Sequence, residues 1–462
     1  MPNSFSAVPD LEEGEAALIE RHLNTIEMRR PSNLMRERYY LGEDAIRDLG
    51  ISIPPNMRDL KTVVGWPSTA VDAVEERLDV DGWVIPGGST ADTGVDEIVQ
   101  QNRLNVTSGP ARLDALIYGL TFFAVSHGDT EAGEPDVLIT AEPPTRMTGT
   151  WDNRLGRLSD ALSVAYRDDV ASDVSLFLPD QTIILHNDRS TGWEVVDVDD
   201  HKLGRPTVVV MANRPRSRRM FGTSRISRAV RSLTDSAVRT LLGMEVAREF
   251  YSSPQRYALG ASEKDFVDAN GNPKSAWEVY LGRFLALDKD ENGNLPKIGQ
   301  LAASSPAPYI DSLKGLASLL AAEACLPASY LGFHTDNPPS GDGMRMLEAR
   351  LVKVAERCQT VFGASETETL QLAVEMAGGS RESVAKLTPI WRDASTPTRA
   401  ASADAGTKLV GAGILQPDSE VTYEYVGLSE TQREILRADA RRQRVAQTVQ
   451  AFAPDDPAPA AV

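Results

Sequence analysis

The segment from Pro308 to Phe362 constrains the fold most, because a helical pattern, a loop rich in proline and glycine, and a second helical pattern follow one another there. In the first pattern apolar residues recur at steps of three and four, which predicts one apolar helix face. That face comprises Ile310, Leu313, Ala317, Leu320 and Ala324. The small residues Gly315, Ala321 and Ala322 keep the helix slim. Slim helices can approach to about 8 to 10 Å, so many copies could crowd around one axis.

The loop between the two helical patterns runs from Tyr330 to Gly343, and its core GFHTDNPPSGDG contains two prolines and three glycines. These residues end the first helix, because proline lacks a backbone donor and glycine favours turns. The apolar periodicity resumes at Met344 and continues to Val361. From the pattern alone two interpretations stay open: a helical hairpin inside a globular core, or a ring of helices with a projecting loop.

Composition limits the class of protein. The chain has 462 residues, of which 41% are hydrophobic, and a chain of this length holds about two to four domains. Its first residues lack the basic flank and apolar stretch of a signal peptide, and no apolar run approaches the roughly 20 residues of a membrane span. We therefore expect a soluble protein, made in a cytoplasm, that enters no membrane. Cys325 and Cys358 lie in apolar helical patterns, which favours buried thiols without a redox role.

The charge of the chain is strongly acidic overall and basic in one place. A formal net charge of −18 argues against a protein that holds nucleic acid tightly through its phosphates, but not against one that lets nucleic acid slide. Nine arginines fall between Arg205 and Arg239, with Asp235 as the only acidic residue among them. This cluster is either a solvated helix face with a loop or a docking surface for an acidic partner.

No pattern of catalytic residues stands out. The sequence has no GxxxxGK[ST], HExxH, GxSxG or CxxC motif, and its five histidines are scattered. The closest approach to a metal motif is DKDENGN, from Asp288, which matches the first half of an EF-hand loop. Gly299 stands where calcium needs a bidentate glutamate, so a β-turn is the better interpretation. We expect no catalytic residue, no metal site and no cofactor.

Local patterns give a coarse order of elements. Helical patterns cover residues 11–40 and 111–125, and short alternating runs between Pro135 and Val210 predict strands of one or two antiparallel sheets. A long helix is predicted from about Thr223 to Tyr251, with Ser224 as its N-cap. Turn-rich sequence from Ser253 to Pro306 then predicts a small β-rich insert.

This order of elements resembles the portal proteins of tailed bacteriophages, specifically those of siphophages that infect actinobacteria. Local stretches are similar to the family as well, and they occur in the family's order over most of the chain. They include YYLGEDAIRDLGISIPP, VVGWPSTAVDAVEERLDVDGW, LFLPD, LGRPTVVVMANRP, FGTSRISRAVRSLTDSAVRTL, SSPQRYALG, LPASYLGF, NPPSGDG and EARLVKVAERCQTVFG. None of these stretches is a chemical signature by itself, so the resemblance depends on their number and order.

The resemblance implies an α+β portal fold with an α/β wing, long stem helices, a small β-rich clip and a helical crown. Residues 1–222 would form the wing, 223–252 a stem helix, 253–307 the clip, 308–329 a second stem helix, 330–343 the tunnel loop, 344–396 a long kinked helix returning to the wing, 397–450 the crown, and 451–462 a disordered tail. In the long helix, Ser365 and Glu368 would form a capping box that restarts the helix after a break at Gly363.

The function implied by the resemblance is that of a channel. The chain would form a homo-oligomeric ring, a dodecamer as in the family, at one capsid vertex of the virion after assembly in the host cytoplasm. Double-stranded DNA would be packaged through the ring by a separate terminase and later ejected. Further partners would be the major capsid and scaffolding proteins and a head-completion or tail adaptor protein. An acidic lumen suits this role, because a basic one would hold the phosphates.

The resemblance also suggests roles for residues. The residues of the tunnel loop that face DNA would be His334, Thr335, Asp336, Asn337, Ser340 and Asp342. The residues that pack the ring would be Gly315, Ala317, Ala321 and Ala322. A docking patch would consist of Arg216, Arg218, Arg219, Arg225 and Arg228. Two alternatives stay open: another ring or scaffold component of a virion, such as a head-completion or capsid protein, and an unrecognised enzyme. A ring with an axial channel of DNA width would distinguish the first hypothesis from both.

Overall fold

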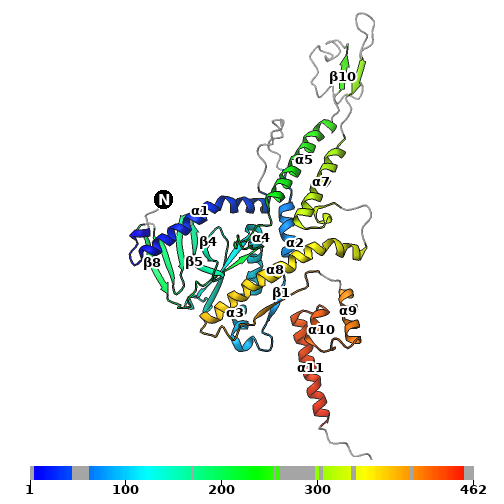
Figure 1. Ribbon diagram of the computed structural model, residues 1–462. Coiled ribbons are helices and arrows are strands. Elements are labelled where there is room, and N and C mark those ends of the chain that lie inside the picture. Colours follow the sequence, from blue (N-terminus) through cyan, green and yellow to red (C-terminus); the bar gives the residue numbers. More distant parts are fainter. Residues whose placement is uncertain are drawn as a thin grey trace, which may run out of the picture. The chain divides into compact units, whose positions relative to one another are not determined.

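The structure is a computed structural model that describes residues 5–43, 62–168, 170–188, 190–252, 256–259, 297–300, 305–333, 340–395 and 399–451. Helices and strands are mixed along the chain, which confirms the predicted α+β class (Figure 1). The chain divides into two units. The larger unit takes residues 1–44, 65–231 and 321–462, and the smaller unit takes residues 45–64 and 232–320.

A five-stranded antiparallel sheet in the order β4-β5-β6-β7-β8 forms the N-terminal part of the larger unit. Its strands are β4 (Met147–Asp152), β5 (Arg157–Arg167), β6 (Val170–Phe177), β7 (Thr182–Asp188) and β8 (Gly192–Asp199). Helix α1 (Glu13–Leu41) shares a core with it, because Ile19 and Ile26 are buried in the same cluster as Leu176 and Leu185. These strands confirm the alternating pattern predicted there.

A second, three-stranded sheet has the order β3-β2-β9 and lies next to the first. It contains β2 (Leu120–His127), β3 (Val137–Glu142) and β9 (Val208–Ala212). The predicted helix over residues 111–125 is therefore wrong in its second half, because α4 (Leu104–Tyr118) ends at Gly119 and β2 follows at once. Both faces of β2 are buried up to Val125, so its sequence shows an unbroken apolar run that periodicity cannot distinguish from a buried helix.

A junction of backbone hydrogen bonds connects this sheet to the helix that follows it. Asn213 donates its backbone N–H to Gly119 O at 2.9 Å, and Thr223 donates to Asn213 O at 2.7 Å. A Cβ on Gly222 would lie 2.4 Å from the carbonyl oxygens of both Asn213 and Gly119, so no other residue fits there. Helix α5 (Arg228–Ser252) begins five residues later than predicted. Its N-cap is Ser227 rather than Ser224, since Ser227 Oγ accepts from Val230 N at 3.2 Å.

Helix α8 (Gly341–Met376) runs through the larger unit without interruption. The predicted break at Gly363 and the capping box of Ser365 with Glu368 are wrong. Ser365 lies inside the helix and donates its hydroxyl to Val210 O at 2.9 Å. A Cβ on Gly363 would lie 2.9 Å from Pro389 and 3.0 Å from Trp391, so this glycine permits close packing of β12 (Thr388–Trp391) instead of ending the helix.

A buried ion pair holds α8 to α4. Arg112 Nε lies 2.7 Å from Glu366 Oε1, and both side chains are almost fully buried. The guanidinium also donates to Leu78 O at 2.8 Å and lies over the Trp391 ring at 4.9 Å. Burial raises the pKa of Glu366 although Arg112 lowers it. The remaining elements here are α2 (Trp66–Glu75), β1 (Val80–Val84), which pairs with β12, and α3 (Val95–Gln101).

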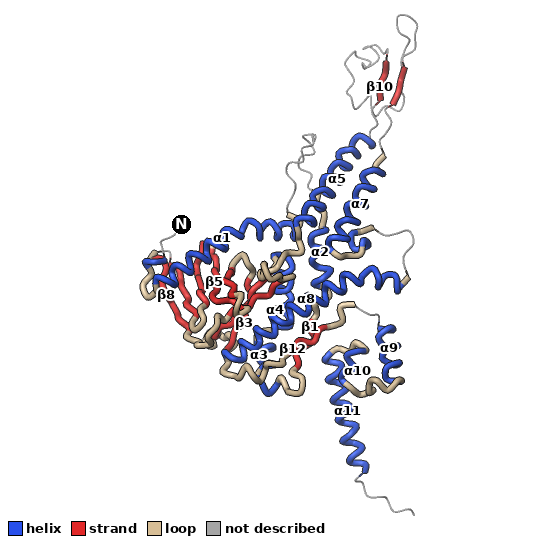
Figure 2. The backbone as a smooth tube through the Cα atoms, in the orientation of Figure 1, coloured by secondary structure: helices blue, strands red, loops and turns tan. Residues whose placement is uncertain are grey.

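In the smaller unit two helices lie side by side (Figures 1 and 2). A Cβ on Gly243 of α5 would lie 3.3 Å from the Tyr309 ring of α7 (Ala307–Ala324), so the glycine brings the two helices close together. Strands β10 (Arg256–Leu259) and β11 (Lys297–Gln300) form a two-stranded antiparallel sheet. The predicted β-rich insert thus contains a strand pair, while the turn predicted from Asp288 lies outside the described residues.

Three helices, α9 (Arg399–Gly411), α10 (Glu420–Tyr425) and α11 (Glu430–Ala451), form the C-terminal part of the described chain. Charged side chains connect them to β1. Arg433 of α11 is only 2% exposed, and it forms ion pairs with Asp81 of β1 and Glu420 of α10. These helices therefore depend on a polar connection to the rest of the larger unit.

Candidate functional site

The base of the predicted tunnel loop is a cluster of three polar side chains from three segments. The short 3-10 helix η5 (Ala328–Leu331) carries Tyr330, α8 carries Glu348, and Arg77 follows the end of α2. The Tyr330 hydroxyl donates to Glu348 Oε1 at 3.0 Å and accepts from Arg77 Nη2 at 2.9 Å. Tyr330 is the first residue of the loop and Glu348 follows the loop, so the cluster closes the loop at its two ends.

Arg77 organises this cluster from a buried position. Its side chain is 8% exposed, lies 3.4 Å from Glu348 Oε2, and donates to Ala394 O at 3.0 Å. Burial and the hydrogen bond to Glu348 raise the pKa of Tyr330. The hydroxyl therefore stays protonated and can act as donor and acceptor at once. No sequence pattern indicates this cluster, because Arg77 and Glu348 are 271 positions apart.

Most of the predicted DNA-facing residues lie outside the described residues, namely His334, Thr335, Asp336 and Asn337. Ser340 caps α8, because its Oγ accepts from Gly343 N at 3.3 Å. Asp342 lies in the first turn of α8, which begins three residues before the predicted start at Met344. The loop is thus shorter at its C-terminal end than the sequence suggested.

The residues predicted to pack the ring separate into two groups on α7. Ala317 and Ala321 are buried within the chain, along the same apolar face as Leu313 and Leu320. Gly315 and Ala322 are exposed. The sequence pattern identified the apolar face, apart from Ile310, which is exposed. It could not distinguish packing inside the chain from packing between copies, because both favour small residues.

The five arginines of the predicted docking patch also fall into two groups, four that are exposed and one that is bonded inside the chain. Arg216, Arg218, Arg219 and Arg228 are exposed. Arg225 does not belong to the patch, because its guanidinium donates to the carbonyl oxygens of Ala70 and Ala324, and burial lowers its pKa. An arginine that donates to carbonyl oxygens inside the chain cannot be distinguished from a surface arginine by sequence alone.

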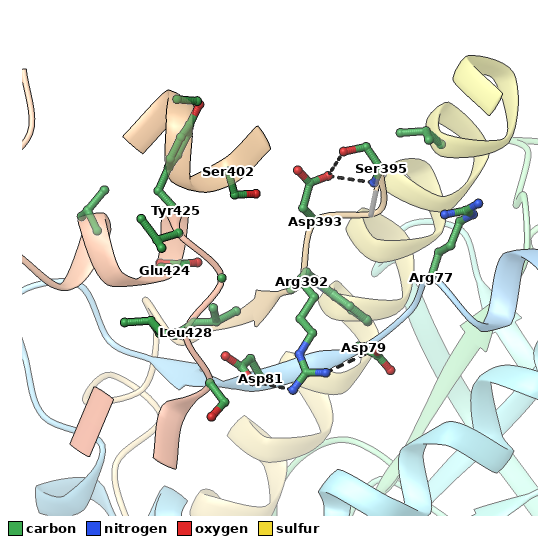
Figure 3. A pocket seen from close by; sticks show the side chains of 18 of the residues that line it. Arg77, Asp79, Asp81, Arg392, Asp393, Ser395, Ser402, Glu424, Tyr425 and Leu428 are labelled. Atoms are coloured by element: carbon green, nitrogen blue, oxygen red, sulfur yellow. Dashed lines mark hydrogen bonds and ion pairs between the residues drawn. The ribbon is translucent and has the colours of Figure 1, made fainter. Parts of the chain in front are cut away.

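A cavity of about 1090 Å³, lined by both charged and apolar side chains, lies between β1 and β12 and the C-terminal helices. In Figure 3, Arg392 reaches toward Asp79 and Asp81, while Tyr425 and Leu428 line the opposite wall. Arg392 Nη2 lies 3.2 Å from Asp81 Oδ1, and Asp81 also pairs with Arg433. The charges on this wall are thus paired with one another, and the cavity is best understood as a joint between two parts of the unit.

The described part of the chain has neither a cluster of metal ligands nor a membrane-spanning helix. No group of three or more His, Cys, Asp or Glu side chains there could hold a metal ion. No helix among the described residues is long and apolar enough to cross a membrane. Of the two cysteines, Cys358 is buried, and burial raises its pKa to about 11, while Cys325 is half-buried.

Comparison with known families identifies the chain. The family model described as phage portal protein, SPP1 Gp6-like, matches residues 19–448. The chain belongs to this portal family. The match includes both sheets, α5, α7 and α8, and most of the C-terminal helices, so the resemblance predicted from the sequence is confirmed over nearly the whole chain.

Portal proteins of two mycobacteriophages are similar to this chain. That of Mycobacterium phage D29 is 33% identical over 409 residues, which cover 86% of this chain and 83% of the relative. That of Mycobacterium phage L5 is 32% identical over 448 residues, covering 93% and 90%. Their source confirms the predicted resemblance to portals of phages with actinobacterial hosts.

A solved structure with a similar arrangement is the neck of a native gene transfer agent particle, computed with C12 symmetry. It shares 12% sequence identity with this portal family member and has a TM-score of 0.45. The alignment covers 79% of this chain and 89% of that chain.

Proposed function

We propose that the chain assembles into a closed ring, twelvefold as expected for its family, around an axial channel for double-stranded DNA. Membership of the portal family over residues 19–448 carries this proposal. The ring is a structural component of the virion and acts without catalytic residues, metal or cofactor. A separate terminase drives the DNA inward, and the same channel later releases it.

Exposed apolar residues on the helices support assembly with further copies. Leu319 on α7 is 60% exposed, and Met346 and Leu347 near the start of α8 are 80% and 54% exposed. Leu319 lies on the same side of α7 as Gly315 and Ala322, one helical turn from each. A neighbouring helix can approach closely there and cover the leucine, which would remove its apolar surface from water.

The ring is tested by native mass spectrometry of the purified chain at micromolar concentration, with negative-stain imaging of the same sample. The expected result is a closed oligomer with an axial channel. Gly315→Trp should lower the ring yield, since overpacking at a repeated interface recurs at every contact. The matched control is Gly14→Trp, at an exposed helical glycine in α1 with open space around it. A wild-type chain that stays monomeric or dimeric would refute the proposal.

We further propose that the segment from Tyr330 to Ser340, which ends where α8 begins, forms the tunnel loop and meets the DNA. The cluster of Arg77, Tyr330 and Glu348 supports this role, because it fixes both ends of the loop to the larger unit. A loop with a fixed base can project into a channel without loosening the helices around it. Asp336 and Asp342 repel phosphates, and His334 alone carries too little positive charge to clamp them, which suits a moving duplex.

The loop is tested by removing Thr335–Pro339, a deletion that spares Ser340 and therefore the cap of α8. The matched control replaces the same five residues by a Gly/Ser linker of equal length. The deleted ring should assemble normally and retain less packaged DNA per particle, measured alongside the fraction of particles that carry a portal. Unchanged packaging and retention would remove the loop's role but not the ring.

The remaining partners follow from the order of regions along the chain. We propose that the β10–β11 insert forms the clip, which docks the terminase during packaging and then the head-completion or tail adaptor protein. The wing contacts the major capsid and scaffolding proteins at one vertex, and α9–α11 form the crown. Replacing residues 256–300 by a short linker should abolish terminase binding in a pull-down and leave the ring intact. Normal binding would contradict the assignment.

A further inference from the structure

A cavity of about 620 Å³ in the larger unit is lined by four arginines. Arg29 and Arg36 come from α1, and Arg218 and Arg219 come from the segment after β9. The other walls combine polar side chains such as Asn33 with apolar ones such as Trp151 and Leu120. We call this the arginine pocket. Four guanidinium groups around one cavity repel one another unless an anion lies between them.

Nothing described in the chain neutralises the pocket. Arg36 donates to Asn33 Oδ1 at 3.1 Å and to Tyr118 O at 2.8 Å, and both acceptors are neutral. Arg29 lies over the Phe221 ring at 5.5 Å. Partial burial and the positive charge of Arg219 lower the pKa of both Arg29 and Arg36. Among the described residues, no ion pair joins a carboxylate to any of these four arginines.

The opposite edge of the same sheet carries the complementary charge. Strand β4 forms one edge of the five-stranded sheet, and its Trp151 lines the arginine pocket. Strand β8 forms the other edge, where Glu194 and Asp197 are exposed. Val196 and Val198 of β8 are also 53% and 46% exposed. An open strand edge with exposed valines is suited to contact with another protein surface.

We infer that the arginine pocket receives the acidic side chains of β8 from a second copy of this chain. This inference rests on the proposed ring, because a ring requires a head-to-tail contact in which two different surfaces of the chain meet. Opposite edges of one sheet provide such a pair of surfaces. Carboxylates form short, charge-assisted pairs with guanidinium groups, so each contact would relieve repulsion in the pocket of one copy and in the acidic edge of the next.

The geometry favours a carboxylate side chain over the phosphates of DNA. Arg36 lies within the cavity, and a double helix is far too wide to enter a space of about 620 Å³. The formal net charge of −18 also supplies many carboxylates on every neighbouring copy. DNA could reach only the exposed rim, at Arg218 and Arg219.

The test uses full-length chains and measures ring yield by native mass spectrometry across a dilution series. Arg219→Glu should shift assembly to concentrations at least about tenfold higher, since like charges then face each other at every contact. Asp197→Arg should do the same. Arg218→Glu is a second pocket variant in case Arg219→Glu does not fold, as judged by circular dichroism. The control Lys386→Glu makes the same change of charge at an exposed site elsewhere and should assemble normally.

The decisive arm is complementation. The double variant Arg219→Glu with Asp197→Arg should regain ring formation, and an equimolar mixture of the two single variants should assemble alternating rings. A failure of the wild-type chain to form rings overturns the proposed function and this inference together. Wild-type rings with normal assembly of both pocket variants overturn this inference alone, as does a lack of rescue in the double variant. Variants that assemble normally but lose binding of a DNA duplex would reassign the pocket to phosphate.

Discussion

Replacing Glu366 by alanine should destabilise the larger unit by about 3 to 5 kcal/mol, the usual cost of removing one partner from a buried ion pair. The Arg112 guanidinium would stay buried, with the Leu78 carbonyl as its remaining hydrogen-bond acceptor and the Trp391 ring against its face. The same substitution at Glu356, which pairs with Lys353 on the exposed side of α8, should cost at most about 1 kcal/mol. Both variants remove a glutamate from an ion pair on α8, and they differ in whether that pair is buried or exposed.

Hydrogen exchange of the α8 amides is the appropriate assay, because a chain with two units does not unfold in one transition and exchange reports local free energy. Arg112→Met combined with Glu366→Leu should recover most of the loss, since no unpaired charge then remains buried. If Glu366→Ala and Glu356→Ala lowered the local free energy of unfolding of α8 by amounts within about 1 kcal/mol of each other, that result would refute the argument. The pair would then be sufficiently solvated to behave like a surface contact.

Three further predictions concern single positions. Gly363→Ala should destabilise the chain in thermal unfolding, because overpacking against Pro389 and Trp391 costs about 1 to 3 kcal/mol and the gain in helix propensity is only about 1 kcal/mol. Gly315→Ala should instead stabilise the unassembled chain, because open space surrounds Gly315. Burial raises the pKa of Asp114 to about 6, so stability should fall as pH rises from about 4 to 6. Asp114→Asn should therefore raise the free energy of unfolding at pH 8 and leave it unchanged at pH 3. An equal effect of the substitution at the two pH values would contradict the prediction. Tyr330→Phe should speed hydrogen exchange in η5 without changing global unfolding, since it loses two local hydrogen bonds.

Periodicity and turn residues predicted the strands from Val137 to Ala212 and, apart from Ile310, the apolar face of α7. Most of these elements keep one face more exposed than the other, and β9, which is buried on both faces, is short enough to indicate a strand. The sequence patterns failed at β2, which is buried on both faces, and at Gly363, where a glycine serves packing across the chain. Both failures have the same cause: the deciding contact comes from a segment far away in the sequence.

The candidate site shows the same limit more strongly. Sequence placed the loop and the arginine cluster, since both are local in composition. It could not show that Arg77 closes the loop base, that Arg225 is used inside the chain, or that Arg29 and Arg36 join Arg218 and Arg219 around one cavity. Such groupings arise only when the fold brings distant segments together.

The junction at Gly119 and Gly222 has a consequence for how this chain can vary. The connection from the three-stranded sheet to α5 is made largely by main-chain groups, with Asn213 and Thr223 bonded through their backbones. Substitution of the surrounding side chains leaves those groups in place, so the joint can survive extensive sequence drift. The two glycines cannot drift with the rest, since a methyl group on Gly222 would meet two carbonyl oxygens. In a library of random variants selected for viable phage, we expect these two positions to stay fixed, whereas neighbours whose side chains make no bond in the joint should change; Asn213, whose side chain donates to Thr223 O, is not one of those.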